Sequence, residues 1–353
     1  MKIVIATPIY PPEIGGPATY TKNLREGLEK KGHSIKIVSY QGLKRYPQPL
    51  KIILYSLRLF KNAKGCDLIY AFNLISCGLP TCFISKILRK KFSIRTGGDF
   101  LWERAVEAGK TKKPLKEYYQ SHKTLKERFW ICLIRKILNK VDKIIFTSYF
   151  QKDIYLKLFD IKEEKIVIIP NPFPEIATID GQSSVNNYQL LYAGRLLKLK
   201  NLQFLINVFY KVLEKTDKDL TLKIIGQGPE KNNLKADDKV VFNPPVSHQD
   251  LLKEIQQSYL CLLLSLTEIT PNFALECIKL GKPILLTKET SYYESLKDKL
   301  IFIDPQNETD LLEKILHLLD EKNYSNYIEK IKSISTDWSW DKVIEQHEKS
   351  FIH

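Results

Sequence analysis

Short apolar runs that alternate with segments of helical periodicity constrain the fold of this 353-residue chain more than any other feature. Apolar runs bounded by turn residues are typical of buried strands, and apolar residues at every third or fourth position are typical of helices. Six strands are expected in the first half of the chain, over 2–7, 34–39, 67–72, 91–96, 143–147 and 165–169. Six more are expected in the second half, over 189–193, 220–225, 239–242, 259–264, 283–287 and 300–303.

A proline-rich and polar segment near residues 170–188 interrupts this alternation and predicts a linker. Strands that alternate with helices form parallel sheets, because a parallel connection needs a long crossover. The pattern therefore predicts an α/β protein with two Rossmann-like, doubly wound parallel-sheet domains that face a cleft. Their expected bounds are 1–170 and 171–337, followed by a C-terminal helix over about 338–353. Ligands of such sheets bind beyond the carboxyl ends of the strands.

The net charge of +15 is carried by the first half of the chain. Residues 1–170 hold 33 Lys and Arg against 14 Asp and Glu, whereas residues 171–353 hold 22 against 26. Two stretches, 43–64 and 110–143, combine basic side chains with aromatic and aliphatic ones, as surfaces that adsorb to anionic lipid do. A solvated lysine-rich surface is the alternative. Nucleic acid could use the same charge, but the chain contains no recognised nucleic-acid module, so we expect an anionic membrane and no nucleic acid as partner.

The first expected strand begins directly after Met1, so we expect no secretory leader, and the six cysteines form neither a CxxC pair nor a Cys/His cluster. Free thiols in a reducing cytoplasm are expected. Residues 68–85 carry no charge, which raises the alternative of a transmembrane helix. Asn73, Gly78 and Pro80 interrupt this run, so we expect a buried strand followed by a helix start. The predicted location is cytoplasmic, peripheral at the inner face of the membrane.

Glu268 and Glu276 lie eight positions apart at the start of a predicted helix. Their spacing alone is uninformative, since Glu313 and Glu321 share it, but their setting is not. Glu268 follows the apolar run 259–264, and Thr270 with Pro271 predicts an N-cap and a first helical residue. The backbone amides of Asn272 and Phe273 are then expected to be unpaired, and a helix start of this kind binds phosphate.

Four further features follow predicted strands and could contribute to the same site. The loop over 8–20 contains Gly15-Gly16 before a helix, which lets the backbone approach a ligand closely; a tight turn is the alternative. Arg195 and Lys200 bracket another loop and could neutralise a diphosphate. Gly228 lies in a turn that leaves room for a flat base or a ribose. Asp99 follows two glycines and could reach the cleft, or it could cap a turn.

The chain resembles the retaining, nucleotide-sugar-dependent glycosyltransferases of family 4, which have the two-lobed GT-B architecture. The resemblance rests on motifs in this order: Gly15-Gly16, Lys31-Gly32-His33, Gly194-Arg195 with Lys200, Gly226-Gln227-Gly228-Pro229, and Glu268 with Glu276. It also implies that the terminal helix packs back on the first lobe.

By this resemblance, the donor diphosphate is bound by Arg195, Lys200, the backbone of Gly16 and the helix start, which is formed by Asn272, Phe273 and Ala274. Glu276 holds the ribose hydroxyls, and Glu268 contacts the transferred sugar. The family retains the anomeric configuration and is described as metal-independent, so no metal and no cofactor beyond the donor are expected. Asp217-Lys218-Asp219 is similar to the metal-binding motif of another glycosyltransferase architecture, but flanking lysines favour a solvated turn.

Two departures from the family pattern leave specific questions open. Many members carry His where this chain has Asp99, which is expected to act on the acceptor side as a second catalytic residue. Residues 243–246 depart from the usual base-binding segment, so UDP and GDP donors both stay open.

The resemblance implies a hexosyltransferase-type enzyme of envelope polysaccharide or glycolipid synthesis. It is expected to act on a lipid-linked or saccharide acceptor at the cytoplasmic membrane face. A nucleotide-sugar hydrolase or epimerase of the same fold is one alternative. A non-catalytic membrane-surface protein that has kept the fold is another.

Overall fold

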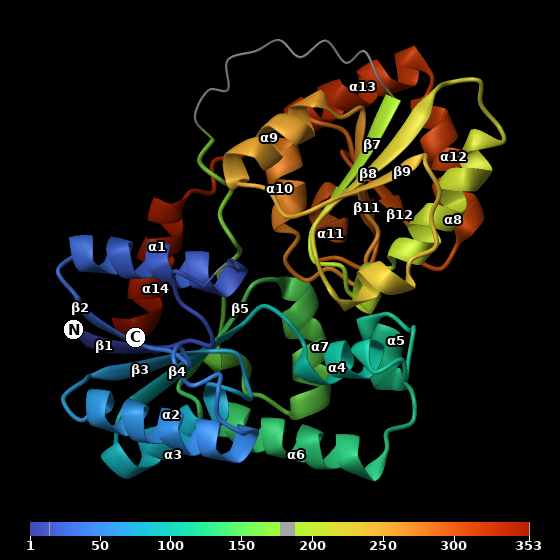
Figure 1. Cartoon of the computed structure of the whole chain (residues 1–353). Coiled ribbons are helices and arrows are strands. Elements are labelled where there is room, and N and C mark those ends of the chain that lie inside the picture. The colour runs from blue at the N-terminus through green and yellow to red at the C-terminus, as the bar shows by residue number, and fades with distance from the viewer. Residues whose placement is uncertain (14, 177–187, 353) are drawn as a thin grey trace. The chain divides into compact units, whose positions relative to one another are not determined.

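The computed structural model describes residues 1–13, 15–176 and 188–352 (Figure 1). The polar stretch 180–187 of the predicted linker lies outside these residues. The chain divides into two compact units. The first comprises residues 1–101, 122–172 and the chain from Trp340 onward, and the second comprises 102–121 and 173–339.

The first unit is built on a parallel sheet with strand order β2-β1-β3-β4-β5-β6. All six predicted strands are present, within one or two residues of their expected ends: β1 (Lys2–Ala6), β2 (Ser34–Val38), β3 (Leu68–Phe72), β4 (Lys91–Thr96), β5 (Lys143–Phe146) and β6 (Ile166–Ile168). The strand and helix start predicted over 68–85 are confirmed, since the helix after β3 begins at Gly78.

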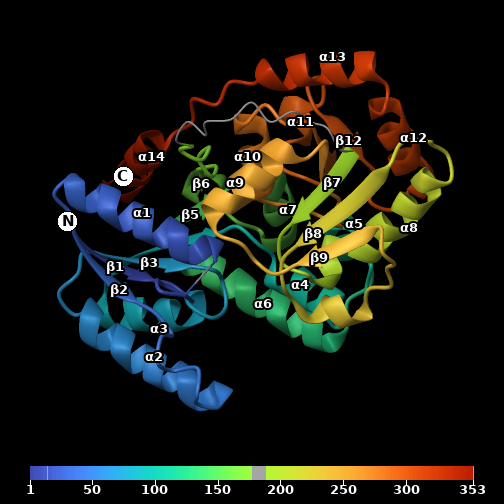
Figure 2. The same ribbon diagram turned by 45° about the horizontal axis from the view of Figure 1, so that its top comes forward.

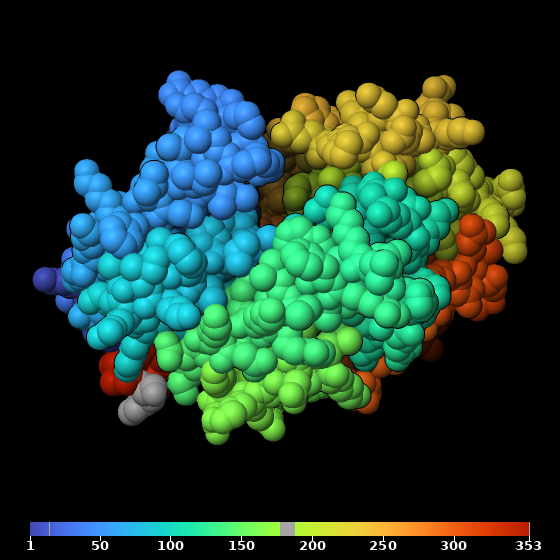
Figure 3. All heavy atoms as spheres, turned by 90° about the horizontal axis from the view of Figure 1, so that it is seen from below, coloured from blue at the N-terminus to red at the C-terminus, as the bar shows by residue number. Residues whose placement is uncertain are grey.

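Helices cover both faces of this sheet, as the strand order requires. Chain direction across the sheet reverses between β2 and β3, so right-handed crossovers place α1 on one face and the following helices on the other. Figures 1 and 2 show α1 and α14 above the sheet, and Figure 3 shows the outer surface of α2, α3 and α6. The helices of this unit are α1 (Gly16–Lys30), α2 (Gln48–Ala63), α3 (Gly78–Leu88), α6 (Leu125–Lys140), α7 (Tyr149–Phe159) and α14 (Trp340–Ile352).

The C-terminal helix α14 packs on α1 through polar as well as apolar contacts. Buried His347 contacts the hydroxyl of Tyr20 through Nε2 at 2.9 Å and that of Tyr70 through Nδ1 at 3.4 Å. Burial, together with the nearby charge of Arg95, lowers the pKa of His347 well below its usual value, so the imidazole is neutral. Lys31 and His33 both contact the carboxylate of Glu348, which gives the Lys31-Gly32-His33 motif a structural role.

The second unit contains a parallel sheet with strand order β12-β11-β10-β7-β8-β9. The six predicted strands are again present: β7 (Tyr188–Ala193), β8 (Leu220–Ile225), β9 (Val240–Asn243), β10 (Leu260–Leu263), β11 (Ile284–Thr287) and β12 (Ile301–Ile303). The chain runs from β7 outward to β9 and then returns to place β10 on the other side of β7. The carboxyl ends of the neighbouring strands β7 and β10 therefore form the topological switch point.

Among the described residues of the second unit, four α-helices connect these strands, two follow β12, and two come from the earlier part of the chain. Residues 102–121 carry the end of α4 (Phe100–Glu107) and all of α5 (Leu115–Gln120), and they belong to the second unit although they precede β5. The predicted first domain, 1–170, includes this segment. The other helices are α8 (Leu202–Leu213), α9 (His248–Gln257), α10 (Asn272–Lys279), α11 (Tyr293–Leu296), α12 (Glu308–Leu318) and α13 (Glu321–Lys332).

A predominantly aliphatic core holds each sheet to its helices. In the second unit every residue of β10 and β11 is buried, as expected of parallel strands between helix layers. Within the described part of the chain, no helix combines the length and the apolar character needed to cross a membrane.

Candidate functional site

The loops after β7 and β8 are held together by backbone hydrogen bonds and by close packing at glycine. The amide of Leu196 donates to the carbonyl of Gln227 at 2.9 Å, and the amide of Glu230 donates back to the carbonyl of Leu196 at 3.1 Å. A Cβ on Gly228 would lie 2.2 Å from the carbonyl oxygen of Leu196, which is backbone and cannot rotate away. Gly226 has φ of 150°, and a Cβ at this position would lie 1.9 Å from the carbonyl oxygen of Gly194. The glycines therefore fix the path of the loop that carries Arg195.

Arg195 itself lies at the exposed end of β7. Its backbone carbonyl accepts a hydrogen bond from the Tyr192 hydroxyl at 3.0 Å, and the pKa of this tyrosine is raised by burial. The backbone of Arg195 is therefore anchored while its guanidinium is accessible to solvent. This is the arrangement that a diphosphate contact needs.

Lys200 and Glu268 come together, as predicted for two residues of one site. The Lys200 ammonium lies 2.5 Å from Oε2 of Glu268, and each side chain is less than 15% exposed. The Ser265 hydroxyl donates to the same oxygen at 2.7 Å. The carboxylate thus carries two donors on one oxygen, at the carboxyl end of β10.

The backbone of Glu268 is fixed by the loop after β11. Its amide donates to the carbonyl of Glu289 at 2.8 Å, and its carbonyl accepts from the Thr290 hydroxyl at 2.8 Å. Glu289 adds a second carboxylate to this region, and its Oε2 is buried without a hydrogen-bond partner. Burial raises the pKa of Glu289, and the nearby Lys116 opposes that rise. Nothing in the sequence singled out Glu289.

The start of α10 differs from the prediction in one respect. The helix begins at Asn272, with Pro271 rather than Thr270 at the N-cap. The amide of Asn272 donates to the Thr270 carbonyl at 3.0 Å, because Pro271 adopts an inverse γ-turn with φ of −79° and ψ of 76°. The prediction that the Asn272 amide is unpaired is therefore wrong. Phe273 and Ala274 lie in the first turn as expected, with buried side chains.

Glu276 lies one turn further along α10 and has a partner that the sequence analysis missed. His248, at the start of α9, places its Nε2 3.0 Å from Oε1 of Glu276. This hydrogen bond raises the pKa of His248. Glu276 is 14% exposed and His248 57% exposed, so the carboxylate is sheltered while the imidazole meets solvent. Ser247 is an ordinary N-cap signal before α9, and nothing in the spacing linked His248 to Glu276.

Glu107 of α4 approaches the same loop from the earlier part of the chain. Its carboxylate accepts from the amide of Leu199 at 3.1 Å and from that of Lys198 at 3.4 Å. Eight residues later, the amide of Leu115 donates to the Thr267 hydroxyl at 2.8 Å. The segment 102–121 thus contacts both loops that carry the paired residues Lys200 and Glu268.

Three predicted site residues belong to the first unit. Gly15 and Gly16 lie where the loop after β1 enters α1, with Gly15 at the N-cap and Pro17 in the first turn. Asp99 follows β4 and is 1% exposed, and its Oδ2 accepts a hydrogen bond from the Tyr155 hydroxyl at 2.9 Å. The donor role of the glycines and the acceptor-side role of Asp99 stay predictions.

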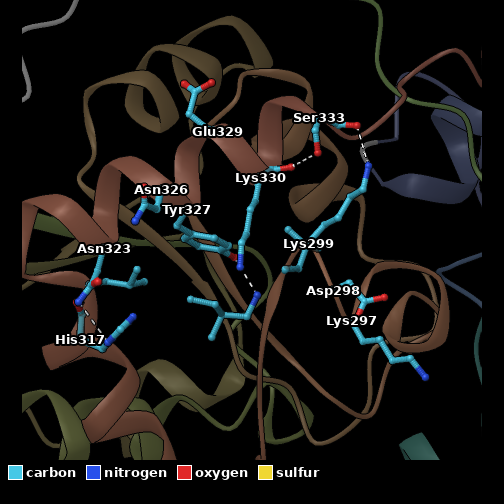
Figure 4. A pocket seen from close by; sticks show the side chains of 13 residues that line it. Lys297, Asp298, Lys299, His317, Asn323, Asn326, Tyr327, Glu329, Lys330 and Ser333 are labelled. Atoms are coloured by element: carbon cyan, nitrogen blue, oxygen red, sulfur yellow. Dashed lines mark hydrogen bonds between the residues drawn. The ribbon is translucent and has the colours of Figure 1, made fainter.

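A large surface hollow lies away from these residues. It has a volume of about 790 Å³ and is lined by residues of α13, by His317 of α12 and by the turn before β12 (Figure 4). Lys299 bonds the Ser333 carbonyl and Lys297 pairs with Glu294, so these lysines have partners on the rim. The hollow opens at the amino end of β12, whereas ligands of parallel sheets bind at carboxyl ends.

The described residues contain no group of three or more His, Cys, Asp or Glu side chains placed to hold a metal ion. Asp219 is exposed and pairs with Lys239 at 2.7 Å, in a solvated turn. Metal independence stays a prediction.

Comparison with known proteins shows to what this chain is similar. Residues 14–174 match the family "Glycosyltransferase Family 4", and residues 178–333 match "Glycosyl transferases group 1". An uncharacterized glycosyltransferase of Haemophilus influenzae is 28% identical over 58% of this chain and 60% of its own length. The alpha-monoglucosyldiacylglycerol synthase of Streptococcus pneumoniae is 24% identical over 90% of this chain and 78% of its own.

A solved structure agrees with the fold. Alr3699/HepE of Anabaena, crystallised with UDP and glucose, superposes with a TM-score of 0.74 at 14% identity and covers 100% of this chain and 99% of its own. The two family matches lie one on each half of the chain, in agreement with its two parallel six-stranded sheets. The protein is therefore a glycosyltransferase of the GT-B type.

Proposed function

We propose that this protein is a retaining glycosyltransferase of the cytoplasmic membrane face. It moves a hexose from a nucleoside diphosphate sugar to a lipid-linked or saccharide acceptor, in the synthesis of an envelope polysaccharide or glycolipid. The observation that carries the proposal is the grouping of Arg195, Lys200, Glu268 and Glu276 around the switch point between β7 and β10.

Each of these groups suits one part of the donor. The guanidinium of Arg195 and the ammonium of Lys200 match the charge of a diphosphate, aided by the first turn of α10. The sheltered carboxylate of Glu276 suits the two ribose hydroxyls, which can both donate to it. Glu268 suits a hydroxyl of the transferred sugar.

The pairing of Glu268 with Lys200 and Ser265 bears on the mechanism. A carboxylate that holds an ammonium and a hydroxyl donor is a weaker nucleophile than a free one, so it suits an acceptor of sugar hydroxyls. We infer that no covalent glycosyl-enzyme forms. The bond between the anomeric carbon and the diphosphate oxygen breaks, and the acceptor oxygen bonds to that carbon on the same face. The departing β-phosphate takes the acceptor proton, and Arg195 with Lys200 stabilises the charge that develops there.

A lipid-linked acceptor is supported by chemistry and by similarity. The first 170 residues carry a net charge of +19, with 33 basic against 14 acidic residues, and an anionic membrane attracts such a surface. The streptococcal relative is named as a diacylglycerol glucoside synthase.

A thermal-shift panel of UDP-, GDP-, ADP- and CMP-sugars tests the donor site. We expect one diphosphate class to stabilise the protein and the CMP-sugar not to do so, because CMP-sugars lack the second phosphate. Proton NMR of the product then reports its anomeric configuration. Release of free sugar or of an epimer without any acceptor would instead identify a hydrolase or an epimerase. Absence of both binding and turnover would identify a non-catalytic protein.

A further inference from the structure

Three helices on one face of the first unit expose an unusual amount of apolar surface. Among the described residues, fourteen large hydrophobic side chains are exposed, and eight of them lie on α2, α3 and α6. The most exposed are Leu125 at 85%, Phe83 at 65%, Phe129 at 64% and Leu57 at 61%. Of the two helices on the opposite face, α1 contributes none and α14 only Ile352. The apolar exposure therefore belongs to one face and is not spread over the unit.

The exposed apolar residues form a stripe on each helix. On α2, Ile53 and Leu57 are separated by four positions and so share one face, and Lys61 continues that line. Phe83 and Ile87 repeat this spacing on α3.

Leu125 and Phe129 do the same on α6, and Lys136 follows on the same side of that helix. Figure 3 shows the three helices side by side on one surface. The stripes thus lie on neighbouring helices, within one surface area that spans all three.

This area is set in positive charge. The three helices carry nine Lys and Arg residues and one acidic residue, Glu127, whose carboxylate caps the start of α6. A second copy of the chain would bring the same positive surface against itself, and the charges would repel. An anionic bilayer complements both properties, because apolar side chains enter the headgroup region while the lysines meet lipid phosphates.

We propose that the outer surface of α2, α3 and α6, here called the three-helix face, docks on an anionic lipid bilayer. The inference rests on the membrane-surface action proposed above and gives it a location. The three-helix face combines α2 and α6, which lie in the two basic stretches of the sequence, with α3, which lies outside them. The charge pattern alone therefore gave no reason to include Phe83 and Ile87 of α3. Both parts contribute to binding, so affinity falls with salt but does not vanish, since apolar insertion is not screened.

Co-sedimentation of the full chain with vesicles tests the proposal. We expect binding to vesicles of phosphatidylcholine with phosphatidylglycerol and weak binding to phosphatidylcholine alone. In a charge variant, Lys61→Glu, Lys86→Glu and Lys136→Glu are combined. Each lysine near an anionic surface contributes about fivefold, so this variant should bind at least about a hundredfold more weakly.

A matched control variant combines Lys22→Glu, Lys30→Glu and Lys342→Glu on α1 and α14, on the opposite face of the sheet. It changes net charge equally and should retain most binding, because charge beyond the Debye length is screened. Equal loss in the two variants would overturn the proposal, since net charge alone would then explain adsorption. So would indifference of the unaltered protein to phosphatidylglycerol.

An apolar variant combines Leu57→Ser, Phe83→Ser and Phe129→Ser. It should lose the salt-resistant part of binding and keep its thermal stability, since these side chains are already exposed. A dimer that dissociates in this variant, with vesicle binding unchanged, would assign the face to a second copy and overturn the proposal. Donor binding by calorimetry separates the two ideas. If the unaltered protein binds donor but not vesicles, only the proposal for the three-helix face is overturned. If the unaltered protein does not bind donor, the proposed function is overturned.

Discussion

Substitution of Glu276 by glutamine tests the donor site with the least structural disturbance. The change keeps the size of the side chain and removes the charge that is proposed to accept two ribose hydroxyls. A hydrogen bond to a charged group contributes about 1.5–3 kcal/mol. Donor Kd should therefore rise about 10- to 150-fold. Isothermal titration calorimetry with the donor found in the thermal-shift panel measures this directly.

The same substitution should have little effect on folding. Glu276 contacts His248 at 3.0 Å, but that imidazole is more than half exposed, so the pair contributes about 0–1 kcal/mol. The Tm should fall by about 2 °C or less. His248→Gln is the matched control: it removes the partner and keeps the carboxylate, so Kd should change by no more than about fivefold. An unchanged Kd in Glu276→Gln, or equal losses in the two variants, would refute the ribose assignment.

Three further changes probe the loops and the C-terminal helix. Gly228→Ala places a Cβ 2.2 Å from the Leu196 carbonyl oxygen, so it should lower the free energy of unfolding by roughly 3 kcal/mol or more and weaken donor binding. Urea titration measures the stability change, and wild-type stability would contradict the packing described for these loops. Lys200→Met leaves the sheltered Glu268 carboxylate without its ammonium partner and should lower the free energy of unfolding by roughly 3 kcal/mol. In a double-mutant cycle, adding Glu268→Gln should recover much of that loss, whereas additive losses would show that the two residues are not coupled. His347 is held neutral in the folded protein, so below its usual pKa of about 6.5 the unfolded chain binds one more proton than the folded chain. The free energy of unfolding should therefore decrease as the pH is lowered through that range, by up to ~1.4 kcal/mol per pH unit. His347→Gln should flatten this slope, and an unchanged slope would disprove the reasoning.

The architecture could be predicted from the sequence because strands of a parallel sheet are buried on both faces. Runs such as 259–264 are therefore apolar, and all twelve predicted strands are present. The residues that follow them could be predicted as a site for the same reason. Lys200 and Glu268 are 68 positions apart in sequence, but they lie in the loops that follow the neighbouring strands β7 and β10, where they form an ion pair.

The predictions failed where the determining contact is local geometry or a long-range pairing without a repeat. The Asn272 amide is paired because Pro271 turns tightly, which a proline signal alone does not specify. His248 lies 28 positions from Glu276 on another helix, and isolated histidines carry no spacing signal. Glu107 and Leu115 belong to the second unit and contact its later loops, although their segment precedes β5 in the chain. Such contacts depend on side-chain packing that periodicity does not encode.

Hydrogen exchange with and without the nucleotide sugar tests the central claim most directly, because it locates the donor without any substitution. We expect slower exchange in peptides that cover 194–201 and 265–276, at the switch point between β7 and β10. Peptides over 297–301 and 323–333, which line the hollow at the amino end of β12, should be unaffected. Protection of that hollow, with no change in the loops after β7 and β10, would contradict the account.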